Sequence, residues 1–469
     1  MDGGGIDTMS NHTKHQKAIK KIETAFQAGK YAEALDFCNI AISLNPRDII
    51  AYRAKGRLLQ IDRDFAGAEQ YYDAAEKRGK LDADDFVNRG IVKAEQQKYD
   101  EAIKDFDRCL KLKPNYLLAY IQRGASQWEM RRWPEALANF REANRLDPSH
   151  ANAQWILGLL LLQQGEFKEG WPLYDTRWRS DRFKSRPLLT QKPQWTPGSE
   201  ARSVLVWGEQ GIGDQVIYAS LLSALKQRVE KVTAMVDPRL ISIFSRSMPD
   251  IEFMSHLDKV RSDSYDAHIP FASLGSCFIE SVDDIAKHAA RKYLKPDPAR
   301  VKAICDEAGF TGNDKVIGLS WVSSAIKIGP HKSVNLEQLL PILKLPGYKF
   351  LNLQYGSSKA AVDHFNQTYG TSIFTSSVDL LKDIEGLAAA CAACDCLVAI
   401  SSSTVHVAGA IGVPVHLMDA NKLWYWGNKD GDQSLWYPSV KIYPRDSVIA
   451  PWDNVIHKVL LSLLGVKNE

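Results

Sequence analysis

"KYDEAIKDFDRCLKLKPNY" (residues 98–116) and "RWPEALANFREANRLDPSH" (residues 132–150) are two copies of one pattern, 34 residues apart. The same spacing continues on both sides of them. An alanine recurs at one place in the pattern and a glycine at another: Ala34, Ala68, Ala102 and Ala136; Gly56, Gly90, Gly124 and Gly158. A fixed period of this length is typical of helix–turn–helix units that stack into a solenoid. The first third of the chain is therefore predicted to be an all-α array.

Other recurring residues indicate how these helices pack. Small residues let the two helices of a unit approach closely, and a proline stops the second helix, as at Pro46, Pro114 and Pro148. An aromatic residue stands four residues after three of the recurring alanines and after Gly170, which takes the next place at the same spacing. We expect these aromatics to fill the gap between one helical pair and the next: Tyr72, Phe106, Phe140 and Tyr174. The pattern resembles the tetratricopeptide repeat, and about five units are predicted over residues 15–180.

Stacked repeats present a concave face, and they most often use it to capture a peptide or a protein. We therefore interpret this region as the binding site for a protein partner. The alternatives are a spacer and a dimerisation arm.

Composition limits the remaining functions. A net charge of +3 over 469 residues gives no basis for nucleic-acid binding. No apolar run reaches the roughly 18 residues that a membrane span requires. Seven cysteines, an odd number without framework spacing, predict reduced thiols and a cytoplasmic protein. Residues 1–14 are Gly-rich and polar, and they are interpreted as a disordered leader or the remnant of a tag.

Residues 181–202, with three prolines, are interpreted as a linker to a different fold. Short apolar runs then alternate with helical segments, which is typical of an α/β fold with mostly parallel sheets. The pattern divides into two Rossmann-like halves, residues 203–300 and 301–469. Strands are predicted at residues 204–207, 231–236, 251–254, 267–269, 316–321, 350–355, 372–375, 397–400, 415–418 and 440–443.

The first half opens with "WGEQGIGDQVIYASLL" (residues 207–222), a Gly-rich turn without the dinucleotide-binding spacing. The turn places Asp214 at the start of a helix, where a carboxylate can accept a proton from a hydroxyl group. Alternatively, Asp214 only stabilises the helix N-terminus. Glu209 is the second candidate carboxylate. The residues predicted to shape this acceptor-side turn are Gly208, Gln210, Gly211, Gly213 and Gln215.

The second half supplies hydroxyl groups and a cation. Ser402, Ser403 and Thr404 precede a helix rich in small residues, and helix N-termini bind anions. Simple N-capping needs only one hydroxyl, so we predict a phosphate site. The full set of predicted donor-binding residues is Ser323, Ser324, Lys332, Gln354, Ser402, Ser403, Thr404, His406 and Trp426.

Several of these residues have an equally ordinary interpretation. His406 either hydrogen-bonds a leaving phosphate or is a core histidine, and Trp426 either stacks on a ligand or fills a hinge. The cysteines of "CAACDC" (residues 391–396) are interpreted as core residues, not as a zinc site. Asp430 and Asp432 are interpreted as a polar turn, so no metal and no cofactor are predicted.

Four segments carry a further resemblance: "GIGDQVIYASLL", "KSVNLEQLLPIL", "ISSSTVHVAGAIGVPV" and "SLWYPSVKIY". They are similar to the heptosyltransferase-like family nine glycosyltransferases, and the join "EGWPLYDTRW" resembles bacterial proteins that fuse repeats to this module, including flagellin-glycosylating ones. The resemblance implies a GT-B fold of two Rossmann-like domains, with Asp214 as the catalytic base. Relatives often carry an aspartate where Ser401 stands, which leaves the nucleotide and the sugar of the donor open.

The sequence thus predicts an inverting, metal-independent glycosyltransferase. It would move a sugar from a nucleotide-activated donor to a Ser or Thr hydroxyl of a protein that the repeats recruit, with flagellin as one such acceptor. The alternative is a non-catalytic scaffold whose glycosyltransferase-like module has lost its activity.

Overall fold

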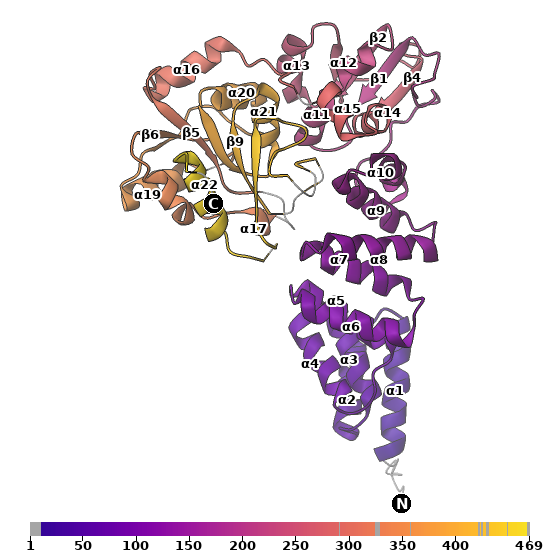
Figure 1. The fold of residues 1–469 in the computed structure, drawn as a ribbon. Coiled ribbons are helices and arrows are strands. Elements are labelled where there is room, and N and C mark those ends of the chain that lie inside the picture. The colour runs from indigo at the N-terminus through magenta and orange to yellow at the C-terminus, as the bar shows by residue number, and fades with distance from the viewer. Residues whose placement is uncertain are drawn as a thin grey trace, which may run out of the picture. The chain divides into compact units, whose positions relative to one another are not determined.

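The computed structural model describes residues 11–289, 291–323, 329–356, 358–420, 423, 425–427, 431–447 and 449–466. Its contacts divide the chain into two compact units, Met1–Ala153 and Gln154–Glu469 (Figure 1). Ten helices open the chain and confirm the predicted repeats: α1 (Asn11–Gln27), α2 (Tyr31–Leu44), α3 (Ile49–Ile61), α4 (Phe65–Glu76), α5 (Ala83–Glu95), α6 (Tyr99–Leu112), α7 (Leu117–Glu129), α8 (Trp133–Leu146), α9 (Ala151–Gln164) and α10 (Phe167–Tyr174).

The recurring glycines and aromatics meet inside each helical pair. A Cβ placed on Gly90 would lie 2.5 Å from the ring of Phe106, and one on Gly124 would lie 2.9 Å from the ring of Phe140. Each ring therefore fills the space that the glycine of its own unit leaves open. The prediction that the rings fill the gap between one pair and the next is therefore corrected, because they pack inside their own pair. Tyr72 also shares a buried cluster with a residue of the next unit, Val92.

The turn inside every repeat carries a left-handed residue. The φ angles are 70° at Gly29, 65° at Arg63, 64° at Gln97, 58° at Arg131 and 83° at Gly165, again at a spacing of 34 residues. Glycine adopts this conformation without steric cost, whereas other residues lose on the order of 1–2 kcal/mol. The tight turn is thus retained in the three central units although their side chains disfavour it.

A ladder of polar bonds joins consecutive repeats. Lys55, Arg89 and Arg123 occupy the same place in three units, and each bonds to the second helix of its own unit and to that of the preceding unit. The partners are Tyr71 and Asn39 for Lys55, Asp105 and Asp73 for Arg89, and Asn139 and Asp107 for Arg123. These bonds supply a cross-link that the small alanines and glycines cannot make.

Two parallel sheets make up the centre of the second unit, as the alternating pattern predicts. The first sheet has the order β3-β2-β1-β4 and the second the order β10-β9-β8-β5-β6-β7. Strands lie at β1 (Ser203–Trp207), β2 (Lys231–Val236), β3 (Glu252–Ser255), β4 (Ala267–Pro270), β5 (Lys315–Ser320), β6 (Tyr348–Asn352), β7 (Ile373–Phe374), β8 (Cys396–Ile400), β9 (Val415–Asp419) and β10 (Val440–Pro444).

Helices connect these strands. They are η1 (Asp175–Arg179), α11 (Ile212–Ala219), α12 (Leu222–Lys226), η2 (Pro238–Leu240), α13 (Ile241–Ser247), η3 (Phe271–Ser273), α14 (Leu274–Phe278), α15 (Val282–His288), α16 (Pro298–Ala308), α17 (Gly329–Lys332), η4 (Leu336–Leu339), α18 (Leu340–Leu343), α19 (Lys359–Tyr369), α20 (Ile384–Ala392), α21 (Ser403–Ile411) and α22 (Asp453–Leu463). Among the described residues, no helix is both long and apolar enough to cross a membrane.

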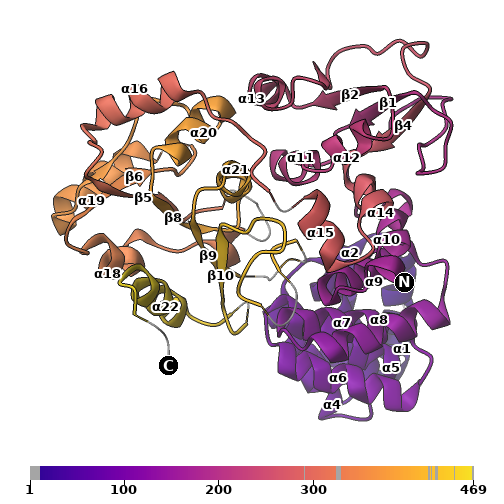
Figure 2. The same cartoon turned by 45° about the horizontal axis from the view of Figure 1, so that its top comes forward.

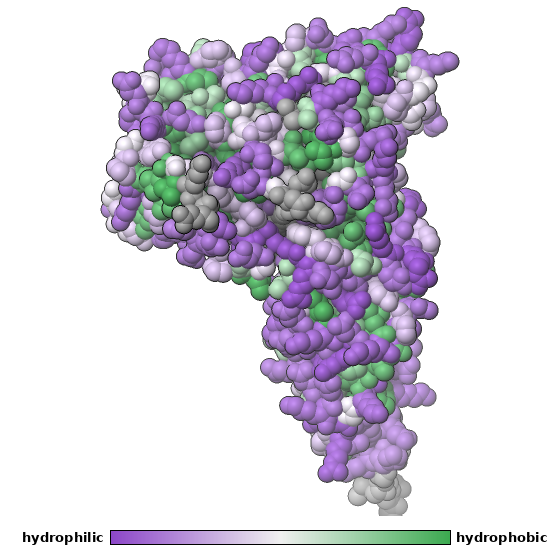
Figure 3. Space-filling model, viewed as in Figure 1, coloured by the Kyte–Doolittle hydropathy of each residue, from purple (hydrophilic) through white to green (hydrophobic). Residues whose placement is uncertain are grey.

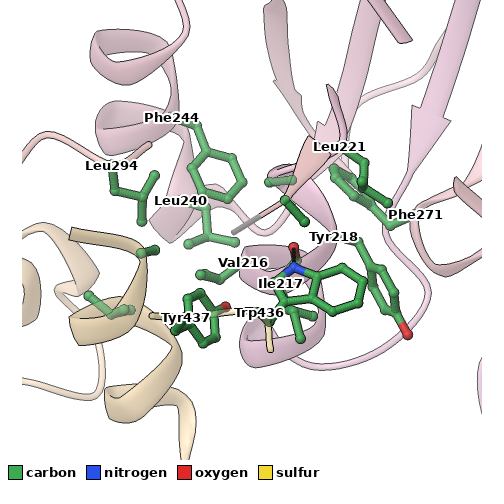
Figure 4. Packing of buried hydrophobic residues seen from close by; sticks show 14 of the residues in the cluster. Val216, Ile217, Tyr218, Leu221, Leu240, Phe244, Phe271, Leu294, Trp436 and Tyr437 are labelled. Carbon is green, nitrogen blue, oxygen red and sulfur yellow. Dashed lines mark hydrogen bonds between the residues drawn. The ribbon is translucent and has the colours of Figure 1, made fainter. Parts of the chain in front are cut away.

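The part of the unit around the first sheet contacts the part around the second sheet through α11 and α21, which lie side by side in Figures 1 and 2. Figure 4 shows Trp436 and Tyr437 packed against α11. The Trp436 indole N–H donates to the carbonyl of Ile217 and to the Ser220 hydroxyl, both at 3.0 Å, and its ring meets Tyr218 edge to face. Buried residues from both sides of this contact therefore form one core, which holds the carboxyl ends of the strands of the two sheets near each other.

The segment predicted as a linker packs beside β4. Trp195 is buried and stacks on Phe278, and its backbone N–H donates to the carbonyl of His268 at 2.8 Å. The helices α9 and α10, which the sequence analysis placed with the repeats, also belong mainly to the second unit by their contacts. On the face drawn in Figure 3, hydrophilic residues dominate both units and hydrophobic residues form scattered patches.

Candidate functional site

Strand order determines where a ligand fits in this unit. In the first sheet the chain runs from β1 to β2 and β3 on one side and returns to β4 on the other, and the second sheet reverses in the same way between β5 and β8. Ligands of parallel α/β sheets bind at such reversals, outside the carboxyl ends of the strands. A cavity of about 370 Å³ lies there, and the predicted residues that line it are Gly211, Gly213, Asp214, Lys332, Ser402, Ser403 and His406.

Asp214 begins the cavity wall on the side of the first sheet. Its Oδ2 accepts the backbone N–H of Gly211 at 3.1 Å, so the carboxylate also closes the first turn of α11, as the alternative interpretation proposed. Burial raises the pKa of Asp214 to about 6, although the Gly211 bond and Lys332 act in the opposite direction. A carboxylate with a pKa close to neutrality suits proton transfer at physiological pH.

Two basic side chains face the same cavity. Lys332, at the end of α17, is only 8% exposed, and burial lowers its pKa while Asp419 and Asp214 oppose the decrease. Arg239 comes from η2 and is held by the carboxylate of Asp237. Its guanidinium also donates to the carbonyl of Leu381 at 2.8 Å, which joins the two halves of the unit beside the cavity.

The serine-rich loop after β8 supplies hydroxyl groups at the N-terminus of α21. Ser401, Ser402 and Ser403 line the cavity. Ser402 is the N-cap residue, but its hydroxyl makes no capping bond, and it is a buried oxygen without a hydrogen-bond partner among the described residues. Thr404 is fully buried, and its hydroxyl also has no hydrogen-bond partner among the described residues. It does not line the cavity. Free backbone N–H groups and hydroxyls at a helix start form an anion-binding arrangement.

His406 lies one turn inside α21 and is neutral. Burial, with a smaller contribution from Lys332, lowers its pKa to about 3. Its Nδ1 lies 3.2 Å from the Tyr437 hydroxyl, and its ring stacks on Trp426 at 4.4 Å. At neutral pH the imidazole can therefore form hydrogen bonds but cannot supply a proton.

Several predicted residues support the site instead of facing it. Trp426 is fully buried, and its indole N–H donates to the Ser401 hydroxyl at 2.9 Å. Gln354 is tied to the backbone of Trp321 and Val322, and the backbone N–H of Ser323 donates to the hydroxyl of Ser333. Ser324 lies outside the described residues.

The residues of the acceptor-side turn divide in the same way. Gly211 and Gly213 line the cavity. The Gln215 side chain bonds to the backbone of Asp237 and packs on Gly208, and Gln210 donates to the Tyr174 hydroxyl at 3.1 Å. Glu209, the second candidate base, is buried against Arg177 and does not line the cavity, so it is unsuitable as a base.

Sequence reasoning missed the cavity residues Arg239, Tyr355 and Ser401 as ligand contacts, and it left Tyr425 open between stacking on a ligand and filling a hinge. Ser401 belongs to the quoted serine run and was detectable there. The other three follow strands β2, β6 and β9, so their position after a strand was a signal, but their type alone does not separate them from structural residues.

No group of three or more His, Cys, Asp or Glu side chains in the described part of the chain is arranged to hold a metal ion. Asp432 pairs with Lys441, and Asp430 lies outside the described residues. Cys391 and Cys394 are buried free thiols, as a core interpretation expects.

Gly213 allows the two halves to meet, because a Cβ at this position would lie 2.7 Å from Cδ2 of His406. The Gly213→Ala variant is expected to lose about 1–3 kcal/mol of unfolding free energy by overpacking, although alanine normally favours a helix. Urea unfolding measures this loss. Gly198→Ala is the control, because no atom lies within 4 Å of a Cβ there. Equal stability of both variants would contradict the close contact.

The raised pKa of Asp214 predicts a pH-dependent stability. The folded protein favours the neutral carboxyl, so its contribution is complete below the ordinary pKa of 3.8 and disappears as the pH rises through about 6. Relative to Asp214→Asn, wild type is expected to lose about 3 kcal/mol of unfolding free energy at most between these values. Urea unfolding at several pH values measures the difference, and a constant difference would contradict the shift.

Comparisons with known proteins support the repeats and extend beyond them. Two models of the tetratricopeptide repeat match residues 83–116 and 121–176. Protein FlbA of Caulobacter vibrioides is 27% identical over 469 aligned residues, which cover 93% of this chain and 70% of that protein. Tetratricopeptide repeat protein 6 of Homo sapiens is 33% identical over 93 residues, 20% of this chain and 18% of that protein.

Among solved structures, YrrB, described as a TPR protein with an unusual peptide-binding site, aligns at 21% identity with a TM-score of 0.32. This alignment covers 34% of this chain and 82% of YrrB. The chain therefore contains tetratricopeptide repeats, and its similarity to protein FlbA extends over most of its length.

Proposed function

We propose that the second unit is a glycosyltransferase of the GT-B type, which moves a sugar from a nucleotide-activated donor to a hydroxyl group of a protein. The observation that carries the proposal is the composition of the cavity. A carboxylate with a pKa of about 6 lies on one side, and the serine-rich start of α21 lies on the other, with Lys332 lining the same cavity. A proton acceptor opposite a phosphate site is what direct displacement of a nucleotide requires.

In the proposed step, the acceptor oxygen attacks the anomeric carbon and its proton passes to the carboxylate of Asp214. The bond from the anomeric carbon to the phosphate oxygen breaks, and its electron pair leaves with the phosphate. The N-terminus of α21, the Ser402 hydroxyl and the side chains of Lys332 and Arg239 stabilise the charge that develops there. One displacement inverts the anomeric configuration.

The repeats are the part of the chain suited to the acceptor, because tetratricopeptide repeats bind peptides and proteins on their concave face. A Ser or Thr of flagellin is the first acceptor to test, since the sequence resembles flagellin-glycosylating proteins. A non-catalytic scaffold remains the second interpretation. The Ser402 hydroxyl favours the enzyme, because it makes no structural hydrogen bond among the described residues. The Asp214 carboxylate does close the first turn of α11, but its raised pKa also suits proton transfer.

The decisive experiment supplies the full chain with UDP-, GDP-, ADP- and CMP-linked sugars, with and without flagellin. Nucleotide release and the mass of the acceptor are measured. We expect one donor to be consumed, and we expect activity to survive EDTA, because basic side chains and a helix start supply the positive charge. If EDTA abolishes the activity and Mg²⁺ or Mn²⁺ restores it, Asp430 and Asp432 become candidate metal ligands. Absence of turnover with every donor would favour the scaffold.

A further inference from the structure

Arg177 and Glu209 form a buried ion pair outside the cavity. Their side chains are 0% and 1% exposed. The guanidinium Nε donates to Oε2 of Glu209 at 3.0 Å, and Nη2 donates to Oε1 at 3.0 Å and to Oε2 at 2.9 Å. Arg177 also bonds to Asp175 and to the Ser273 hydroxyl. The pair thus joins η1, directly after the last repeat helix, to the loop after β1.

Glu209 lies in the Gly-rich turn, between Gly208 and Gly211. Its Oε1 also accepts the backbone N–H of Ala272 at 2.8 Å, so the carboxylate has a fixed orientation. The next residue, Gln210, donates to the hydroxyl of Tyr174 at the end of α10. Gly211 follows, and its N–H holds Asp214. Every step from Arg177 to the cavity is therefore a hydrogen bond or a short piece of backbone.

We infer that Arg177 is a positioning residue, which sets the place of Asp214 by holding Glu209 and the turn between them. The inference rests on the proposed function. A planar guanidinium bound to a carboxylate by two bonds fixes distance and angle together, which a lysine cannot do. A buried ion pair adds little net stability over apolar packing, whereas it can specify one geometry. The end of the repeat array is accordingly part of the catalytic unit.

The test uses the full chain and hydrolysis of the donor, in which water replaces the protein acceptor. The Arg177→Lys variant is expected to lower kcat roughly ten- to hundredfold, because the carboxylate of Asp214 would no longer be held in the position from which it accepts the proton. The dissociation constant of the donor is expected to stay near the wild-type value, because the proposed phosphate contacts come from Lys332 and the serine loop. Ser273→Ala is a milder second variant that removes one bond to Arg177.

Arg89→Lys is the matched control. Arg89 is also buried and holds a buried carboxylate, that of Asp105, by two bonds, but it lies in the other compact unit. It is expected to lower stability and to leave kcat and donor affinity unchanged. If folded Arg177→Lys and Ser273→Ala both keep the wild-type kcat, the inference is overturned.

A second readout separates this inference from the proposed function. The pKa of Asp214 is obtained from the pH dependence of unfolding in the Arg177→Lys background, with and without Asp214→Asn. The ionisable groups that line the cavity with Asp214 are Lys332, Arg239, His406 and Tyr425. Tyr174, Tyr218 and Tyr437 interact with its charge electrostatically. If wild type consumes no donor, the proposed function fails. An altered Asp214 pKa would then still support the positioning role, and an unaltered one would overturn it.

Discussion

Asp214→Asn is expected to lower donor turnover by about 10²–10⁴-fold, the usual effect of losing a general base, while donor affinity stays close to wild type. The amide has nearly the same size as the carboxylate, and its oxygen can still accept the Gly211 N–H that closes the first turn of α11. The substitution removes the negative charge and, with it, the capacity to take up a proton. Nucleotide release under saturating donor and a direct binding assay measure the two quantities.

Lys332→Ala is the companion variant, and it is expected to weaken donor binding as well as turnover. Lys332 faces the same cavity from α17, on the side of the proposed phosphate site. Near-normal turnover by Asp214→Asn at saturating donor would remove Asp214 as the base. A loss of donor affinity as large as that of Lys332→Ala would assign it to the donor site. Glu209 is not the replacement, because Arg177 already occupies its carboxylate.

Periodicity explains why the elements of this fold could be predicted. The 34-residue spacing located the repeat helices, and short apolar runs located all ten described strands, since both patterns can be read directly along the sequence. The left-handed turns at Arg63, Gln97 and Arg131 escaped prediction because nothing in those residue types favours a positive φ. Only the spacing from Gly29 to Gly165 pointed to them.

The site was predictable to the extent that it follows strand ends. Asp214, Lys332 and Ser402 each come from a segment after β1, β5 or β8, and parallel strands bring their carboxyl ends to one edge. Thr404 was predicted to line the cavity, but its side chain lies in the core. It follows Ser402 by two residues, and that step along a helix places a side chain on another face. Direction within a loop or a helix depends on packing that the sequence alone does not show.

The extent of the second unit was the least predictable feature. Residues 181–202 look like a linker because they contain three prolines, yet Trp195 is buried within them. A cut in this segment would separate Arg177 from Glu209 and leave a buried carboxylate without its partner. Such a cut is expected to destabilise the α/β module, so activity is best assigned with the full chain.

Asp105→Asn is expected to lower the stability of the repeats by about 3–5 kcal/mol, the usual cost of breaking a buried ion pair. Asp105 is 1% exposed and accepts hydrogen bonds from Arg89 and Lys93, whose side chains are also buried. Asparagine keeps the shape of the side chain but removes its charge. Its NH2 group is itself a hydrogen-bond donor and would face the donor groups of Arg89 and Lys93. Among the described residues, Arg89 would then keep only the more exposed carboxylates of Asp73 and Glu76, and Lys93 would keep only that of Glu101 at 4.0 Å.

Asp107→Asn is the control, because Asp107 is 44% exposed and pairs with Arg123 in the same ladder. An exposed pair of this kind contributes at most about 1 kcal/mol. Hydrogen exchange of the α5 and α6 amides in the intact chain measures both variants without requiring that the two compact units unfold together. Similar losses of stability in the two variants would show that the burial of Asp105 does not determine its contribution. The buried and exposed bonds of the ladder would then contribute equally.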